Sequence, residues 1–126
     1  MDVTPIIPAG KQVLERYGTE GFRVSGTLHQ GAILLFPDET LAWAPSAMAE
    51  VTEASLAPVV ARGGVEILLL GCGRRMALVP PALRAHLKAA GVVIDAMDTG
   101  AACRTYSVLL GEGRRVAAAL LPITAE

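Results

Sequence analysis

Aromatic side chains are scarce in this sequence of 126 residues, where they make up 4% of the chain. A core therefore cannot depend on large rings, and Ala, Val, Leu and Ile must fill it. That supply is ample, because 52% of the residues are hydrophobic. A chain of this length buries roughly two-thirds of its unfolded surface when it folds. The composition therefore predicts one domain over residues 1–126 that needs no covalent or metal staple.

Cysteine is also rare, and its two occurrences match no metal-binding motif. Cys72 and Cys103 do not belong to a Cys-x-x-Cys pair, and His29 and His86 are distant from both in the sequence. A zinc site normally has three or four ligands at recognisable spacings. We therefore expect no bound metal and no cofactor.

Neither sign of charge dominates, because the chain has eleven Lys and Arg residues and twelve Asp and Glu residues, which gives a net charge of −1. A surface that binds duplex DNA usually shows a basic excess or a clustered basic face. The pairs Arg74–Arg75 and Arg114–Arg115 are too few for such a surface, although they leave a local anion site open. The sequence predicts no nucleic-acid partner.

Long apolar runs are absent too. None approaches the ~20 residues of a membrane-spanning helix, and the longest, residues 32–36 and 116–121, have the length of strands. The N-terminus also lacks the basic and then apolar segments of a secretion signal. We therefore expect a cytoplasmic chain without membrane insertion.

The first part of the chain is predicted to be an irregular lead-in and then a meander. Residues 1–20 form the lead-in, where Pro5 and Pro8 oppose regular structure. Polarity patterns and turn residues then predict three antiparallel strands, with His29 in the first turn. Their expected ranges are 22–28, 32–36 and 40–44.

The remaining chain alternates helices with strands. Ser55 and Asp98 are placed to cap two of the helices, and Leu83, Leu87 and Ala90 share one face of another. The expected helices are 56–62, 80–90 and 99–110, and the expected strands are 65–70, 92–96 and 116–121. The first two of these strands are expected to be buried on both faces.

This order predicts a three-layer α/β fold. Strands that alternate with short helices imply β-α-β crossovers and parallel pairing, whereas the N-terminal meander implies antiparallel pairing. The central sheet should therefore be mixed. Trp43, the only tryptophan, is expected in the core.

Two loops after predicted parallel strands are candidates for a ligand site. Open α/β sheets bind ligands outside the carboxyl ends of their strands. In the segment Gly71-Cys72-Gly73-Arg74-Arg75, glycines allow close backbone approach and arginines supply charge and paired donors. The alternative is that these glycines only turn the chain and the arginines face solvent. The candidate ligand-binding residues are Gly71, Cys72, Gly73, Arg74, Asp98, Thr99 and Arg104.

The same residues have structural interpretations. Cys72 as a nucleophile needs a base within reach, and the sequence shows none beyond His86, so small core filling is the alternative. Asp98 is either a helix cap or a residue that faces a ligand. We assign no catalytic residue, and the sequence favours a binding protein over an enzyme.

Several segments together resemble the small Mth-type α/β domain family. They are residues 97–109 (MDTGAACRTYSVL), 112–120 (EGRRVAAAL), 21–24 (GFRV), 34–37 (LLFP) and 68–73 (LLLGCG). Eukaryotic relatives in that family include a mitochondrial complex I assembly factor and an adipogenesis-associated protein with an Mth domain. Relatives commonly have Asn where this chain has Ser107. The composition, rich in Ala, Gly and Arg, is typical of a bacterial protein.

The resemblance implies a three-layer fold with a mixed sheet, no established enzymatic activity and no known cofactor. It favours a binding or assembly module with a protein partner, and it leaves a homodimer open. The alternative is an enzyme that binds a small molecule or an anion through the two loops described above. The first hypothesis predicts an exposed apolar patch, and the second predicts a hollow between the loops.

Overall fold

The computed structural model describes residues 10–124, and its centre is a five-stranded sheet in the order β5-β4-β8-β6-β7. Strand β6 is parallel to β7 and β8, whereas β4 is antiparallel to β5 and β8. The mixed sheet predicted from the sequence is therefore confirmed. The bounds of its strands are β4 Ile33–Phe36, β5 Glu39–Ala42, β6 Ile67–Gly71, β7 Val93–Met97 and β8 Val116–Leu120.

A second, smaller sheet precedes the central one, and it corrects the predicted meander. Its three antiparallel strands are β1 Leu14–Tyr17, β2 Gly21–Val24 and β3 Thr27–Gln30. The single strand expected over residues 22–28 is wrong, because the chain reverses at Ser25 and Gly26. Both have positive φ, 46° and 85°, as the two central residues of a type I′ hairpin turn require.

Two further expectations for this region are also wrong. Strand β1 lies inside residues 1–20, which were expected to be irregular, and His29 lies on β3 and not in a turn. Pro5 and Pro8, on which the lead-in depended, lie outside the described residues.

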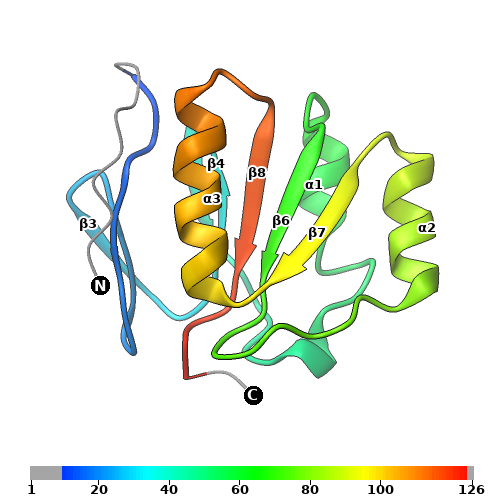
Figure 1. The fold of residues 1–126 in the computed structure, drawn as a ribbon, viewed down its shortest axis with the longest axis horizontal. Coiled ribbons are helices and arrows are strands. Elements are labelled where there is room, and N and C mark those ends of the chain that lie inside the picture. The colour runs from blue at the N-terminus through cyan, green and yellow to red at the C-terminus, as the bar shows by residue number, and fades with distance from the viewer. Residues whose placement is uncertain (1–9, 125–126) are drawn as a thin grey trace.

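Three helices and the small sheet cover the two faces of the central sheet, which gives the predicted three layers (Figure 1). Helices α1 (Ala57–Arg62) and α2 (Pro81–Ala89) lie on one face. Helix α3 (Thr99–Gly111) and the small sheet lie on the other. A short 3-10 helix, η1 (Met48–Glu50), lies in the connection from β5 to α1. None of the helices among residues 10–124 is long and apolar enough to cross a membrane.

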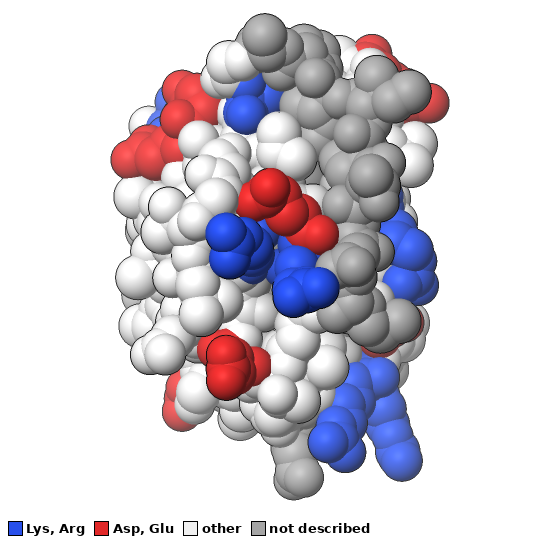
Figure 2. Space-filling model, turned by 90° about the vertical axis from the view of Figure 1, so that its left-hand side faces the viewer, with Lys and Arg blue, Asp and Glu red and all other residues white. Residues whose placement is uncertain are grey.

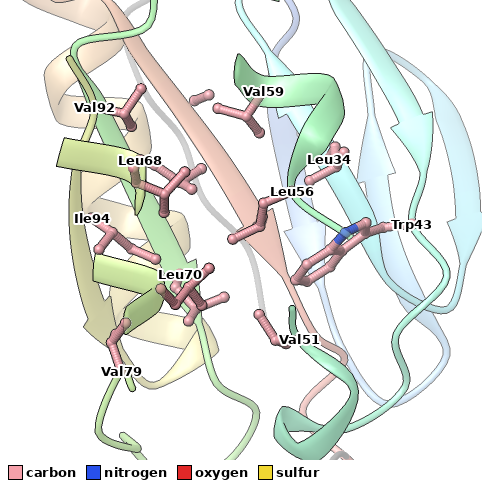
Figure 3. Packing of buried hydrophobic residues seen from close by; sticks show 14 of the residues in the cluster. Leu34, Trp43, Val51, Leu56, Val59, Leu68, Leu70, Val79, Val92 and Ile94 are labelled. Atoms are coloured by element: carbon pink, nitrogen blue, oxygen red, sulfur yellow. The ribbon is translucent and has the colours of Figure 1, made fainter. Parts of the chain in front are cut away.

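Alternate residues of each strand enter two different hydrophobic clusters. Leu68 and Leu70 of β6 face α1 and α2, while Leu69 faces α3, as the two-residue period of a strand requires. Figure 3 shows the first cluster, in which Trp43 lies beside Leu56. Trp43 is 7% exposed, and its Nε1 donates to the Ser55 carbonyl oxygen at 2.7 Å. The core position predicted for Trp43 is confirmed.

The second cluster joins α3 to the small sheet. Tyr106 of α3 and Phe22 of β2 are fully buried in it, together with Cys103. The small sheet therefore shares a core with α3 and is not a separate appendage.

Three local predictions fail for physical reasons. Ser55 does not cap α1, because its hydroxyl donates to the Thr52 carbonyl oxygen and the helix begins at Ala57. Ala90 lies beyond the end of α2 and is exposed. Strand β7 is not buried on both faces, since it is an edge strand whose Val93 is 59% exposed.

The Tyr106 hydroxyl is fully buried and has no hydrogen-bond partner among the described residues. Burial raises the pKa of this phenol, so the group stays neutral and unpaired. A Tyr106→Phe change should therefore stabilise the fold by about 1 kcal/mol, because a buried polar group without a partner costs free energy. Urea unfolding followed by circular dichroism measures the difference.

Tyr17→Phe is the matched control, because the Tyr17 hydroxyl accepts a hydrogen bond from Arg104 Nη1 at 3.1 Å. This change should lower the free energy of unfolding. A Tyr106→Phe protein that is less stable than the wild type would contradict the account of an unpaired hydroxyl.

Candidate functional site

The two loops singled out in the sequence meet at the carboxyl ends of β6 and β7. The two strands are parallel neighbours in which Gly71 lies opposite Met97. The Cys72 amide donates to the Met97 carbonyl oxygen at 2.8 Å, and the Thr99 amide donates to the Gly73 carbonyl oxygen at 2.8 Å. The loops therefore lie together, as their positions after adjacent strands predicted, and they are bonded directly to each other.

The Thr99 hydroxyl joins this junction to the end of β8. It is fully buried, accepts a hydrogen bond from the Gly73 amide at 2.8 Å and donates to the Leu121 carbonyl oxygen at 2.6 Å. The Leu121 amide in turn donates to the Gly71 carbonyl oxygen at 2.9 Å. One side chain therefore ties together the segments that follow three neighbouring strands.

Gly71 is closely packed against Thr99 and Leu120. A Cβ atom at this position would lie 2.9 Å from Leu120 Cδ2, 3.0 Å from Thr99 Oγ1 and 3.1 Å from Thr99 Cα. Glycine is therefore needed here for close packing. The ligand-binding role of this junction stays a prediction from the sequence.

Cys72 and Asp98 both take structural positions. Cys72 is 3% exposed, and its Sγ donates to the Leu70 carbonyl oxygen at 3.7 Å. Burial raises the pKa of this thiol, which disfavours the thiolate that a nucleophile requires. Asp98 Oδ1 accepts a hydrogen bond from the Ala101 amide at 2.9 Å, so its predicted role as the cap of α3 is confirmed.

The two candidate arginines are bonded to segments outside the two loops. Arg74 Nε donates to the Ile123 carbonyl oxygen at 3.1 Å. Arg104 Nη1 reaches the Tyr17 hydroxyl on β1, so it belongs to the contact between α3 and the small sheet. The structure thus brings together Gly71, Cys72, Gly73, Asp98 and Thr99. A Cβ atom at Gly100 would lie 3.3 Å from both Arg104 Nη1 and Asp98 Oδ1, so Arg104 is close to the second loop.

Sequence reasoning missed the segment 76–79, which connects the junction to α2. Ala77 and Val79 pack on the core, whereas Met76 is 59% exposed and Leu78 is 84% exposed. All four residues are apolar, although buried and exposed side chains alternate along the segment. The hydropathy of the sequence therefore could not predict which of them are exposed.

Among residues 10–124, two hollows are lined by residues outside the two loops. The larger, of about 570 Å³, is lined by residues of β1, β2 and the turn between them, and by Leu28 of β3. The smaller, of about 220 Å³, lies at the opposite end of the central sheet, where β6 and β8 begin. Figure 2 shows acidic and basic side chains interspersed over the face formed by the small sheet, where Arg23 and Glu15 pair at 3.7 Å. Among residues 10–124, no group of three His, Cys, Asp or Glu side chains is arranged to hold a metal ion.

The Thr99 hydroxyl provides a direct test of the junction. Thr99→Val keeps the shape of the side chain but leaves the Gly73 amide and the Leu121 carbonyl without their buried partner. The loss should lower the free energy of unfolding by about 3 kcal/mol, which urea unfolding measures. Thr99→Ser keeps the hydroxyl and should cost much less. Equal stability of the valine and serine variants would show that these hydrogen bonds do not hold the junction.

Comparison with other proteins gives relatives over most of the chain. The sequence is 39% identical over 116 residues to an uncharacterized protein of Rhodobacter capsulatus, and the match covers 91% of this chain and 88% of that protein. It is 30% identical over 110 residues to NADH dehydrogenase (ubiquinone) 1 alpha subcomplex assembly factor 3 of Xenopus tropicalis. That match covers 86% of this chain but only 60% of the assembly factor.

The fold also matches a solved structure. The solution NMR structure of a Bordetella pertussis protein described as a Mth938-like domain has a TM-score of 0.82 and 30% sequence identity, over 98% of this chain and 93% of that one. A family model described as "Protein of unknown function (DUF498/DUF598)" matches residues 14–121. The Mth-type resemblance is therefore confirmed, and the chain belongs to the DUF498/DUF598 family.

Proposed function

We propose that this chain is a protein-binding module that assists the assembly of a larger complex. The similarity to an assembly factor across 86% of the chain supports this role. The chain spans 60% of that relative's length, so the identity of a partner does not follow from the comparison. The binding surface has to be argued from the residues of this chain.

The observation that carries the proposal is the pair of large apolar side chains exposed on segment 76–79. Met76 and Leu78 both face solvent at positions where the chain is anchored on either side. Burying an exposed side chain of this size against a partner contributes about 1.5–3 kcal/mol. Methionine also adapts its shape to different partner surfaces, which suits a module that recognises another protein.

The segment is held in place before a partner arrives. Ala77 and Val79 pack against the first core cluster, and the Arg74 side chain is bonded to the Ile123 carbonyl oxygen. A binding segment that is already ordered loses less conformational entropy on association. Arg75 is exposed beside it and adds a residue type that is enriched in protein interfaces.

The alternative of an enzyme that uses the β6 and β7 loops gains no support from the geometry, because Thr99 fills the space between them. Pairing of two copies and a cytoplasmic location stay predictions from the sequence.

A double variant tests the proposed surface. Tagged wild-type chain should capture a stoichiometric protein partner from an extract of its source cells. Met76→Ser combined with Leu78→Ser should reduce that capture roughly tenfold or more, because two apolar contacts are lost. Quantitative mass spectrometry of the captured proteins measures the reduction.

Val108→Ser is the matched control, because Val108 is also 59% exposed but lies on α3. This variant should capture the partner as the wild type does. Capture that is equal in all three proteins, or the absence of any stoichiometric partner, would contradict the proposed role of segment 76–79.

A further inference from the structure

The smaller hollow lies at the end of the central sheet opposite to segment 76–79, where the loops before β6 and β8 meet the turn between β4 and β5 (Figure 1). Its volume is about 220 Å³, below the roughly 300–1,000 Å³ of pockets that bind drug-sized ligands. Any ligand that it takes must therefore be small.

The chemistry of the walls is divided into an apolar floor and a basic rim. Phe36 and Val116, each 1% exposed, and Leu110, 3% exposed, contribute to the floor. The basic side chains of the lining come from three different parts of the chain, and no Asp or Glu is found among the described lining residues. These basic residues are Lys11, Arg62, Arg114 and Arg115.

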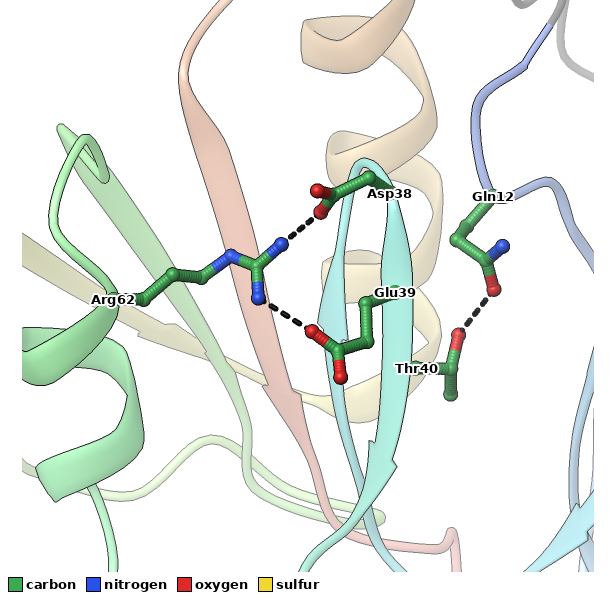
Figure 4. A network of polar contacts seen from close by, with 5 residues as sticks. All are labelled: Gln12, Asp38, Glu39, Thr40 and Arg62. Carbon is green, nitrogen blue, oxygen red and sulfur yellow. Dashed lines mark hydrogen bonds and ion pairs between the residues drawn. The ribbon is translucent and has the colours of Figure 1, made fainter.

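Arg62 is fixed in position by carboxylates outside the hollow. Its side chain reaches from the end of α1 to the β4–β5 turn, where it bonds Asp38 and, at 2.6 Å, Glu39 Oε2 (Figure 4). Its guanidinium carbon lies 4.3 Å from the centre of the Phe36 ring. The charge of Arg62 is therefore balanced by these carboxylates. Its guanidinium group forms part of the wall of the hollow and packs on the Phe36 ring, which it helps to hold in place.

The other three cations are less completely neutralised. Arg114 and Arg115 share one carboxylate, that of Glu66, at 3.3 Å and 3.4 Å, and Lys11 adds a further positive charge. Lys11 and the three arginines carry four positive charges, and the carboxylates of Asp38, Glu39 and Glu66 carry three negative charges. The net charge of these described side chains is therefore +1. A ligand with one negative charge would balance it.

We propose that this hollow binds a small organic monoanion, namely a carboxylate carried on an apolar body. The carboxylate faces Lys11, Arg114 and Arg115, whose donors form charge-assisted hydrogen bonds with such a group. The apolar body lies on Phe36 and its neighbours in the floor. This site is separate from the proposed protein-binding segment, since the two lie at opposite ends of the sheet.

Benzoate and benzyl alcohol form a matched pair of probes, because they share a ring and differ in charge. Gly63, Gly64 and Gly113 line the hollow, and their backbone amides report on it in ¹H–¹⁵N NMR spectra. Benzoate at low salt should shift these three resonances saturably. Benzyl alcohol should leave them nearly unchanged, and added salt should weaken benzoate binding because it screens the exposed charges.

Substitutions of the basic residues that line the hollow test whether they bind benzoate. Lys11→Gln and Arg115→Gln should each weaken benzoate binding about tenfold, as expected for the loss of one charge-assisted contact. Both side chains are exposed, so the fold should be kept, which the same spectra verify. Lys88→Gln removes an exposed charge on α2, outside the hollow, and should leave binding unchanged.

Three outcomes would overturn the proposal. The first is equal shifts with benzyl alcohol, which would show that charge is not recognised. The second is weakening of equal size in the Lys88→Gln control, which would show diffuse attraction to the whole surface. The third is stronger binding of inorganic phosphate than of benzoate at the same glycines, which would show that the apolar floor takes no part.

Discussion

The architecture depends on the burial of β8 between strands that come much earlier in the chain. All five residues of this strand are at most 1% exposed. In the five-stranded sheet of the described residues, it lies between the β4–β5 hairpin and the β6–β7 pair and joins them. Three of its five residues are the consecutive alanines Ala117 to Ala119. Their small side chains allow elements on both faces of the sheet to pack close to the β8 backbone. The hydrophobic effect and the hydrogen bonds on both of its edges act together at this position.

The order of the crossover elements was predictable because their signals are local. Asp98 precedes an apolar helical pattern and caps α3, and Gly91 and Pro80 mark the ends of α2. The hairpin at Ser25 and Gly26 escaped prediction because the polarity alternates across it without interruption. The edge position of β7 also escaped, since the order of strands in a sheet is set by long-range packing and not by the sequence of one strand.

The candidate site was predictable in its location but not in its chemistry. Parallel strands that follow one another through a helix place their carboxyl ends together, so the meeting of the two loops followed from the strand assignment. That a single threonine would fill the space between them depends on the position of β8, which reaches the junction from another part of the chain. The apolar segment 76–79 and the basic rim around Phe36 likewise arise from residues that only the tertiary fold brings to one surface.

The central position of β8 also has a consequence for synthesis. The ribosome makes β4 and β6 before it makes β8, so both strands emerge while the place between them is empty. Each then presents an open edge of backbone donors and acceptors, bordered by apolar side chains such as Leu35 and Leu69. Edges of this kind pair readily with those of other chains. The newborn protein is therefore most prone to aggregate in the interval before its fifth central strand leaves the exit tunnel.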